Sequence, residues 1–154
     1  MTDNQSVIRP ARADEAASLR ELEIASKGHW GYDAAYLARF AAVVSMSPDF
    51  IERNEVWVLD QEGTVAGFYT LIHNPKYAVL DSLWLLPHWI GGGLGRTLFE
   101  HAVERARAAG ATRLEWGAEP HALGFYERMG GRNLRDTTSE LGNPIKVMGL
   151  DLVR

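Results

Sequence analysis

The sequence contains no cysteine. This absence excludes disulfide bonds, thiolate metal ligands and a cysteine nucleophile, and it suits the reducing cytoplasm, where we expect the protein to act. No apolar run approaches the length that crosses a membrane, and the polar start of the sequence lacks the apolar core of a signal peptide. Basic residues are not in excess: the net charge is -4, which argues against a nucleic-acid partner.

The length and the hydrophobic patterns indicate one globular domain. The 154 residues, 46% of them hydrophobic, are enough for a single core, so we expect one domain over residues 1–154. Apolar alternation predicts seven strands, and helical spacing predicts four helices with a short helical turn after Ser47. Asp14 and Asp33 are the expected N-caps of the first two helices, and Ser47 is the expected N-cap of the short turn, with Pro48 at its first position. The expected strands are 6–10, 55–60, 64–72, 77–86, 113–118, 132–139 and 146–152, and the expected helices are about 14–26, 33–44, 94–109 and 123–129. This order predicts an α+β fold with helices covering a central, mostly antiparallel sheet.

The stretch LWLLPHWIGGGLG, residues 83–95, organises the rest of the chain. An apolar strand ends near Pro87, three glycines follow, and a helix begins at about Gly93 or Leu94. The first amides of a helix have no acceptor inside the helix, and its dipole favours an anion there. Glycines let a phosphate approach the backbone closely. This stretch therefore predicts a site for a phosphate-bearing ligand.

Two familiar phosphate loops do not fit these glycines. No Lys-Ser or Lys-Thr pair follows them, which excludes a Walker A loop. The dinucleotide-binding pattern usually follows the first strand of a chain, whereas these glycines lie past the middle.

Two motifs together give the chain its resemblance to a family. The first is Ile90-Gly91-Gly92-Gly93-Leu94-Gly95, which is similar to Arg/Gln-x-x-Gly-x-Gly/Ala with isoleucine at the first position. The second runs from Glu119 to Gly130, EPHALGFYERMG, and is similar to Asn-x-x-Ala-x-x-Phe-Tyr-Glu-x-x-Gly with glutamate at the first position. In this order and spacing, the motifs resemble those of the GNAT superfamily of acyl-CoA-dependent N-acyltransferases, and the likeness covers essentially the whole chain.

The resemblance implies acetyl-CoA as the acyl donor and a sheet splayed between its fourth and fifth strands. The diphosphate would meet the amides of the glycine loop, and pantetheine would pair with the backbone of Leu83 and Leu85. No metal is expected. The residues that the resemblance assigns to the coenzyme are Leu83, Leu85, Ile90, Gly91, Gly92, Gly93, Leu94, Gly95, Arg96, Glu119, Ala122 and Phe125.

The resemblance also assigns proton-transfer roles. It implies that Tyr126 protonates the departing CoA thiolate, since a phenol with a pKa of about 10 is protonated at neutral pH. A primary amine acceptor needs a base or a water chain to remove its proton. Asp81 is the first choice because alternation places it on the strand face of Leu83 and Leu85, although a strand-edge salt bridge is an equal alternative. His29 is second, and His73 and Glu115 are weaker candidates.

The acceptor is expected between the first two helices. His29, Trp30, Tyr32 and Asp33 gather there in the sequence, and aromatic rings with a carboxylate suit an amine cation. The expected acceptor is a small molecule or an amino acid. The alternatives are a protein N-acetyltransferase acting on a lysine or an N-terminus, and a non-catalytic acyl-CoA-binding or sensing domain. The C-terminal strand pair offers an edge through which a homodimer could form.

Overall fold

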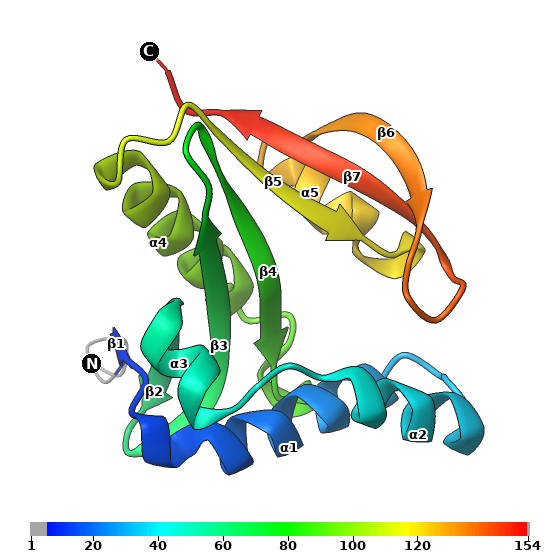
Figure 1. Cartoon of the computed structure of the whole chain (residues 1–154). Coiled ribbons are helices and arrows are strands. Elements are labelled where there is room, and N and C mark those ends of the chain that lie inside the picture. The colour runs from blue at the N-terminus through cyan, green and yellow to red at the C-terminus, as the bar shows by residue number, and fades with distance from the viewer. Residues whose placement is uncertain (1–5, 154) are drawn as a thin grey trace. The chain divides into compact units, whose positions relative to one another are not determined.

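The structure is a computed structural model that describes residues 6–153. The described residues form a mixed sheet of seven strands, in the order β1-β2-β3-β4-β5-β7-β6, and five α-helices (Figure 1). β4 and β5 are parallel, whereas β1-β2, β5-β7 and β6-β7 are antiparallel. The predicted α+β fold is confirmed. The strands are β1 (Ser6–Pro10), β2 (Glu55–Gln61), β3 (Thr64–His73), β4 (Tyr77–Leu85), β5 (Arg113–Ala118), β6 (Arg132–Thr138) and β7 (Pro144–Asp151), and the helices are α1 (Ala16–Gly28), α2 (Ala34–Val43), α3 (Pro48–Arg53), α4 (Leu94–Ala108) and α5 (Leu123–Arg128).

The chain forms two compact units. The first contains the chain up to Thr70 together with Ser82–Leu98, and the second contains Leu71–Asp81 and the chain from Phe99 onward. The boundaries fall inside β3, β4 and α4, so each of these elements has residues in both units.

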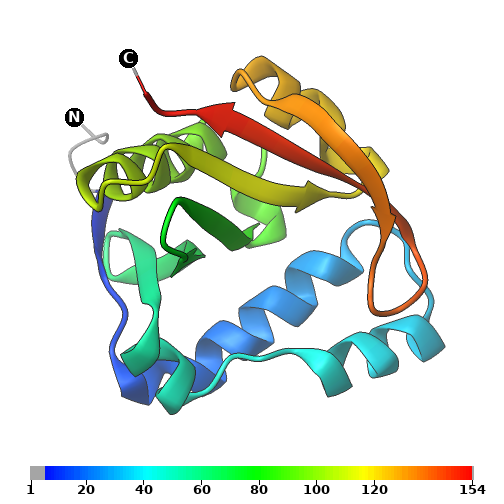
Figure 2. The ribbon, with the colours of Figure 1, turned by 45° about the horizontal axis from the view of Figure 1, so that its top comes forward.

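The core of the first unit lies between its helices and the strands β2 and β3. Leu19 and Leu22 of α1, Ile51 of α3, Val58 of β2 and Phe68 of β3 belong to one buried cluster. The helical and alternating spacings of these residues explain why the elements form, since burying each such side chain contributes about 1.5–3 kcal/mol. α1 and α2 lie side by side (Figure 2).

Capping side chains mark the starts of α2 and α3. The Asp33 carboxylate accepts a hydrogen bond from the Tyr36 amide at 2.8 Å, and the Ser47 hydroxyl accepts one from the Phe50 amide at 3.0 Å. Both positions agree with the sequence prediction. The predicted turn after Ser47 is the helix α3, with Pro48 at its first position.

The start of α1 differs from the prediction that Asp14 is its N-cap. A 3-10 turn, Ala13–Glu15, precedes α1, and Glu15 is the residue that caps the backbone: its carboxylate accepts from the Arg12 amide at 2.8 Å. Arg9 also donates to Glu15 through two nitrogens, at 2.9 and 2.8 Å. This long-range pairing with Arg9 holds Glu15 in place, and local helix rules do not reveal it.

The second unit packs α5 and α4 against its own strands. The ring of Phe99 in α4 meets that of Trp116 in β5 edge to face, with centroids 5.2 Å apart. The ring of Tyr126 in α5 is tilted against Trp116 at the same centroid distance of 5.2 Å. Figure 1 shows α5 beside β5 and β7. At Gly131, which follows α5, an added Cβ would lie 2.6 Å from the Trp116 ring, so only glycine fits there.

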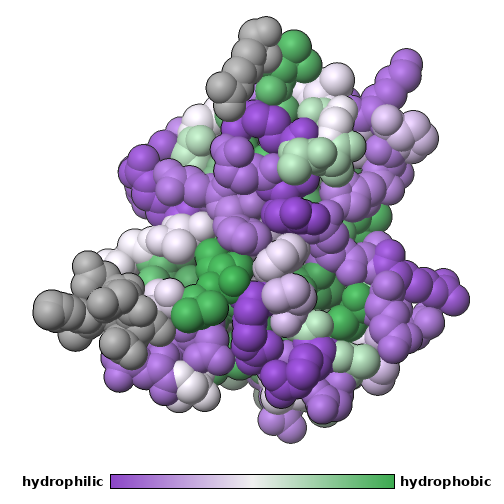
Figure 3. Space-filling view, turned by 90° about the vertical axis from the view of Figure 1, so that its left-hand side faces the viewer, coloured by the Kyte–Doolittle hydropathy of each residue, from purple (hydrophilic) through white to green (hydrophobic). Residues whose placement is uncertain are grey.

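Hydrophilic residues cover most of the face shown in Figure 3, and hydrophobic residues appear there only in small groups. The large hydrophobic side chains that are exposed among the described residues are Val7, Trp30, Val43 and Val153. No helix within residues 6–153 has the length and apolar character that a membrane span requires.

Candidate active site

The glycine loop follows the end of β4. After Leu85, a 3-10 turn over Pro87–Trp89 leads into residues 91–93. Gly91 and Gly93 have positive φ values of 93° and 88°, and a Cβ added to either would meet nothing within 4 Å. The backbone conformation, rather than packing, therefore requires glycine at these two positions.

The first turn of α4 has backbone amides with no acceptor inside the helix. The Thr97 amide donates to the Gly93 carbonyl at 3.2 Å, which is the first hydrogen bond of the helix. Leu94, Gly95 and Arg96 therefore occupy the first helical positions, whose amides have no acceptor inside a helix. Within the described part of the chain, the amides of residues 91–93 donate no hydrogen bond either, and all three glycines are exposed. This arrangement is suited to an anion.

Ile90 and Arg96 set the charge around this loop. Ile90 is half-buried, and its amide donates to the Pro87 carbonyl at 3.2 Å, so it closes the preceding turn and brings no charge. Arg96 is exposed at the third helical position. The loop thus offers backbone donors first and a guanidinium second.

Close backbone packing fixes the end of β4 within the first unit. A Cβ at Gly67 of β3 would lie 2.5 Å from the Trp84 carbonyl oxygen and 2.7 Å from the Leu85 side chain. The Leu86 amide donates to the Ala66 carbonyl at 2.8 Å. Glycine at position 67 therefore lets β3 approach the backbone that carries Leu83 and Leu85.

β4 and β5 pair only over their first residues. Tyr77–Val79 pairs with Arg113–Glu115, and no further pairing is recorded between these strands among residues 6–153, although β4 continues to Leu85 and β5 to Ala118. The two parallel strands therefore part after Val79, which confirms the predicted splay between the fourth and fifth strands.

Tyr126 lies in an aromatic cluster of the second unit. Its ring centroid is 5.2 Å from that of Trp116, 6.0 Å from that of Phe99 and 5.1 Å from that of Phe125. The residue is 8% exposed, and burial raises the pKa of its phenol above the ordinary value of 10.0. The hydroxyl group therefore stays protonated at neutral pH and is available as a hydrogen-bond donor.

The second unit also contains Asp81, the candidate base, and Glu119, a candidate coenzyme contact. Asp81 is exposed as a residue, yet the protein around its carboxyl group raises the pKa above 3.8 by desolvation. Glu119 precedes the 3-10 turn Pro120–Ala122, and its carbonyl accepts from the Ala122 amide at 2.9 Å.

The predicted acceptor residues lie in the first unit, between α1 and α2. The rings of His29 and Trp30 are exposed and meet edge to face, with centroids 4.8 Å apart. Tyr32 stacks on Tyr36 with a centroid distance of 4.4 Å. The Asp33 carboxylate is engaged as the cap of α2, so helix capping accounts for this residue without a ligand.

Sequence reasoning missed a buried cation beside these residues. Lys27, near the end of α1, is only 4% exposed, and its ammonium lies 4.6 Å from the Tyr32 ring and 6.0 Å from the Trp84 ring. Tyr36 and Phe40 recur at helical spacing in α2 and complete the surroundings, at 5.5 and 5.0 Å. Their i, i+4 spacing is the signal in the sequence that points to a shared face.

The two weaker base candidates, Glu115 and His73, have different surroundings. Glu115 is buried in β5, where Arg113 lies 2.6 Å and Arg135 3.6 Å from its carboxylate oxygens, so ion pairing accounts for it. His73 is exposed at the end of β3. Among the described residues, no three His, Asp or Glu side chains gather as a metal site would require.

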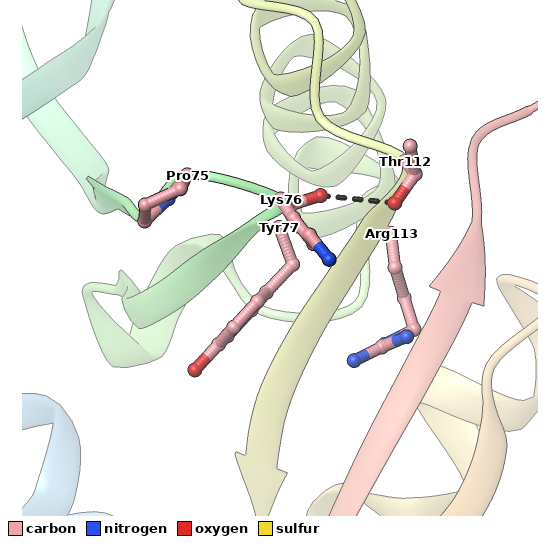
Figure 4. Close-up of a pocket in the computed structure, with 5 residues that line it drawn as sticks. All are labelled: Pro75, Lys76, Tyr77, Thr112 and Arg113. Atoms are coloured by element: carbon pink, nitrogen blue, oxygen red, sulfur yellow. Dashed lines mark hydrogen bonds between the residues drawn. The ribbon is translucent and has the colours of Figure 1, made fainter.

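A cavity of about 430 Å³ opens in the second unit, and it contains none of the predicted site residues. Pro75, Lys76, Tyr77, Thr112 and Arg113 line it, where β4 and β5 begin (Figure 4). The Thr112 hydroxyl donates to the Lys76 carbonyl at 2.9 Å and closes one side. The parting of β4 from β5 lies at the other end of these strands, so this cavity is separate from the predicted coenzyme residues in the sequence.

Comparisons with known proteins agree with this geometry. Residues 17–131 match the pattern of the acetyltransferase (GNAT) family. The peptidyl-lysine N-acetyltransferase YjaB of Salmonella typhimurium is 33% identical over 119 residues, which cover 75% of each chain. The GCN5-related N-acetyltransferase from Rhodopseudomonas palustris has a TM-score of 0.82 at 20% identity, with 96% of each chain covered. The PaiA N-acetyltransferase from Thermoplasma acidophilum, solved with coenzyme A, has a TM-score of 0.82 at 18% identity, covering 95% of this chain and 98% of the other.

The chain therefore shares the fold of these N-acetyltransferases, with a seven-stranded sheet that parts between β4 and β5. The chain belongs to the acetyltransferase (GNAT) family, as the match over residues 17–131 and the 33% identical relative show. It is an N-acetyltransferase, and the predicted enzyme class is confirmed.

Proposed function

We propose that this N-acetyltransferase moves the acetyl group of acetyl-CoA to the primary amine of a small molecule or an amino acid by direct attack. The observation that carries the proposal is the row of amides of Gly91, Gly92 and Gly93 ahead of α4, which are exposed and donate no hydrogen bond within residues 6–153. Such a row matches a diphosphate in charge and in hydrogen-bonding character. Family membership supports acetyl-CoA as the donor.

The coenzyme would be held mainly by backbone groups. The amides of residues 91–95 receive the diphosphate, and Arg96 adds a positive charge. The pantetheine amides pair with the backbone at Leu83 and Leu85, as a peptide pairs with a strand edge. The second motif contributes Glu119, Ala122 and Phe125 to the coenzyme contacts.

In the chemical step, the neutral amine nitrogen attacks the carbonyl carbon of the thioester. The C–N bond forms, the C–S bond breaks, and the electron pair of that bond leaves on the sulfur. The Leu83 amide donates to the carbonyl oxygen while negative charge develops there, a contribution of roughly 2–4 kcal/mol. Burial keeps the Tyr126 phenol protonated, and Tyr126 gives that proton to the CoA thiolate as the C–S bond breaks. The nitrogen loses its second proton as the amide forms, and this proton passes through water to the Tyr126 phenolate, so the step ends with a neutral amide, a CoA thiol and a protonated tyrosine.

The amine must lose a proton before it attacks, because an ammonium group is not nucleophilic. We propose that Asp81 accepts this proton, either directly or through a water molecule. Strand alternation within β4 gives Asp81 the same face as Leu83, and the raised pKa of its carboxyl makes it a stronger base than an ordinary aspartate.

A lysine side chain of a protein is the second candidate acceptor. The observation that favours it is the 33% identity to a relative named as a peptidyl-lysine N-acetyltransferase. We also propose that residues 1–154 form one acetyltransferase domain without a resident metal, and that the enzyme acts in the cytoplasm, which the lack of cysteine suits.

A screen of acceptors tests the proposed reaction. Release of the CoA thiol from acetyl-CoA is followed with small amines, amino acids and lysine peptides. Turnover of an amine or amino acid is the expected result. Turnover of peptides alone would move the assignment to the second candidate. Binding of coenzyme A without turnover of any acceptor would refute acetyl transfer and favour a sensing role.

A pair of glycine variants tests the diphosphate site by calorimetry. Gly92 has no positive φ, and an added Cβ would meet only the Trp89 carbonyl, at 3.9 Å, so Gly92→Ala should fold normally. The new methyl group would stand where the diphosphate approaches, and we expect acetyl-CoA to bind about 10-fold more weakly, a loss of about 1.4 kcal/mol. The matched control is Gly28→Ala, whose Cβ makes an ordinary 3.5 Å contact with Leu37. Equal affinities in both variants and the wild type would contradict the site.

A further inference from the structure

Lys27 is a lysine in an unusual place for a charged residue. It is 4% exposed, and a lysine is almost never buried to this degree unless other groups stabilise its charge. Its ammonium lies within 6.0 Å of four ring centroids, and a cation this close to a ring face is attracted to the π-electrons. The rings belong to Tyr32, Tyr36, Phe40 and Trp84.

The four rings contact one another in two pairs, and the Lys27 ammonium lies close to both pairs. Tyr32 and Tyr36 are stacked, with an interplanar angle of 16°, and Phe40 meets Trp84 edge to face at 6.0 Å. Trp84 belongs to β4, whereas Tyr36 and Phe40 belong to α2. One ammonium on the last turn of α1 therefore links α1, α2 and the end of β4 within the first unit. A lysine in this turn also interacts favourably with the helix dipole.

We infer that these four rings form a cation cage filled by the protein's own Lys27, and that Lys27 is a positioning residue for the acceptor side of the enzyme. Lys27 immediately precedes the segment 28–33, which carries His29, Trp30 and Tyr32. Trp84 immediately follows Leu83, whose amide the proposed reaction uses. The ammonium therefore fixes both the acceptor segment and the reacting end of β4.

The filled cage changes how the acceptor is recognised. Aromatic rings beside α2 would suit an amine cation, but Tyr32 already has the Lys27 ammonium 4.6 Å from its ring. The acceptor amine therefore meets the exposed rings of His29 and Trp30 rather than the cage. This consequence rests on the proposed acetyl transfer, whereas the cage itself does not.

Chemical rescue tests the cage without any assay of activity. Lys27→Ala removes the butylammonium chain and leaves four rings around the gap. We expect its melting temperature to fall by about 4 °C or more. Added n-butylammonium should restore most of the loss, and 1-butanol, which has the same chain without the charge, should restore little. Lys146→Ala is the control: Lys146 pairs with Asp136 at the surface, and neither additive should affect its melting temperature selectively.

Two further variants cover the case in which Lys27→Ala does not fold. Lys27→Arg keeps the charge and should stay close to the wild type, whereas Lys27→Met keeps the length but not the charge and should be less stable. A Lys27→Met protein as stable as the wild type would overturn the cage. Equal rescue of Lys27→Ala by butanol and butylammonium would overturn it too.

A kinetic comparison tests the positioning role. With any acceptor that the wild type acetylates, Lys27→Ala should raise the acceptor KM about 10-fold or more, and n-butylammonium should lower it again. An unchanged KM in a destabilised Lys27→Ala would leave the cage in place and refute the positioning role. If the wild type acetylates no amine, the acetyl-transfer proposal fails, and the melting experiments still decide on the cage.

Discussion

At the scale of single residues, the proposed acid role of Tyr126 predicts a large effect on kcat. Tyr126→Phe removes one hydroxyl group and keeps the ring that packs on Trp116 and Phe125. A general acid contributes typically 10²–10⁴-fold, so we expect kcat to fall by roughly 100-fold or more, with the affinity for acetyl-CoA changed less than about twofold. Single-turnover kinetics and calorimetry measure the two quantities.

Tyr77→Phe is the matched control for this variant. It removes the same group from a half-buried tyrosine whose ring lies 5.5 Å from the Arg113 guanidinium. Its kcat should equal that of the wild type. A wild-type kcat in Tyr126→Phe would remove the acid role from Tyr126.

The lowered pKa of Glu15 predicts how the free energy of unfolding depends on pH. The pKa of Glu15 is lowered from 4.5 to about 2, mainly by hydrogen bonds from Arg9. Desolvation opposes this shift in part, and a hydrogen bond from the Arg12 amide adds to it. The unfolded chain therefore takes up a proton at higher pH than the folded chain does. The stabilisation is complete above about pH 5 and is lost as the pH falls from 4.5 towards 2. Arg9 is 26% exposed, so solvent screening limits the effect to about 2 kcal/mol.

Urea unfolding at pH 7 and pH 3 measures this effect. Glu15→Gln should lose about 2 kcal/mol at pH 7 and much less at pH 3, where the wild type has lost the same interaction. Asp14→Asn, next to it in the same turn, changes an exposed carboxylate and should cost less than about 0.5 kcal/mol at either pH. A Glu15→Gln deficit that is equal at both pH values would contradict the assignment.

Whether the role of a residue can be predicted from the sequence depends on how close in the sequence its partners lie. Asp33 and Ser47 are predicted correctly as caps, because a cap needs only the amide three residues ahead. Asp14 is predicted wrongly, because Glu15 is held by Arg9, six residues away in another element. Lys27 escapes prediction for the same reason: one ring of its cage, Trp84, lies far along the chain.

At the scale of elements, the contact of β3 with β4 gives a stability prediction. A Cβ at Gly67 would lie 2.5 Å from the backbone oxygen of Trp84, and a backbone atom cannot move aside cheaply. We expect Gly67→Ala to lower the free energy of unfolding by about 1–3 kcal/mol. It should also weaken acetyl-CoA binding if the backbone at Leu83 pairs with pantetheine. Urea unfolding and calorimetry with the same protein measure both.

Gly117→Ala is the control on another strand. Its Cβ would lie 3.1 Å from the terminal methyl of Ile145, which is the flexible end of a side chain. The loss of stability should therefore be smaller than for Gly67→Ala. The prediction fails if the two variants lose the same stability.

Most elements are predictable because their signals are local. The β2-β3 hairpin follows from Glu62-Gly63, whose positive φ values of 56° and 89° give the turn that strand twist favours. The start of α4 follows from its glycines, and its end from Gly110, which has a φ of 88°. The position of β7 between β5 and β6 is not predictable in this way, since it depends on pairing between segments about 35 residues apart, such as Leu114 with Leu150.

At the scale of the whole molecule, the two units share their elements, and this predicts how the protein unfolds. The unit boundaries fall within β3 after Thr70, within β4 after Asp81 and within α4 after Leu98. A strand or helix divided in this way loses hydrogen bonds in both units when either one unfolds, so neither unit has a complete set of elements alone. We therefore expect a single cooperative transition, with circular dichroism and tryptophan fluorescence changing at the same temperature.

The binding of acetyl-CoA provides a second, independent test of this single transition. A ligand that binds only the folded protein adds about 2.7 kcal/mol when its concentration is 100 times its Kd. In one cooperative transition, that free energy raises the melting temperature of every signal equally. If the units were independent, a ligand held by the glycine loop would shift only the part that contains residues 91–95. Two transitions, or a shift confined to one signal, would therefore show that the shared elements do not couple the units. At the same acetyl-CoA concentration, the 10-fold weaker binding expected of Gly92→Ala leaves about 1.4 kcal/mol, so a single shift that falls to about half in this variant would tie the coupling to the loop itself.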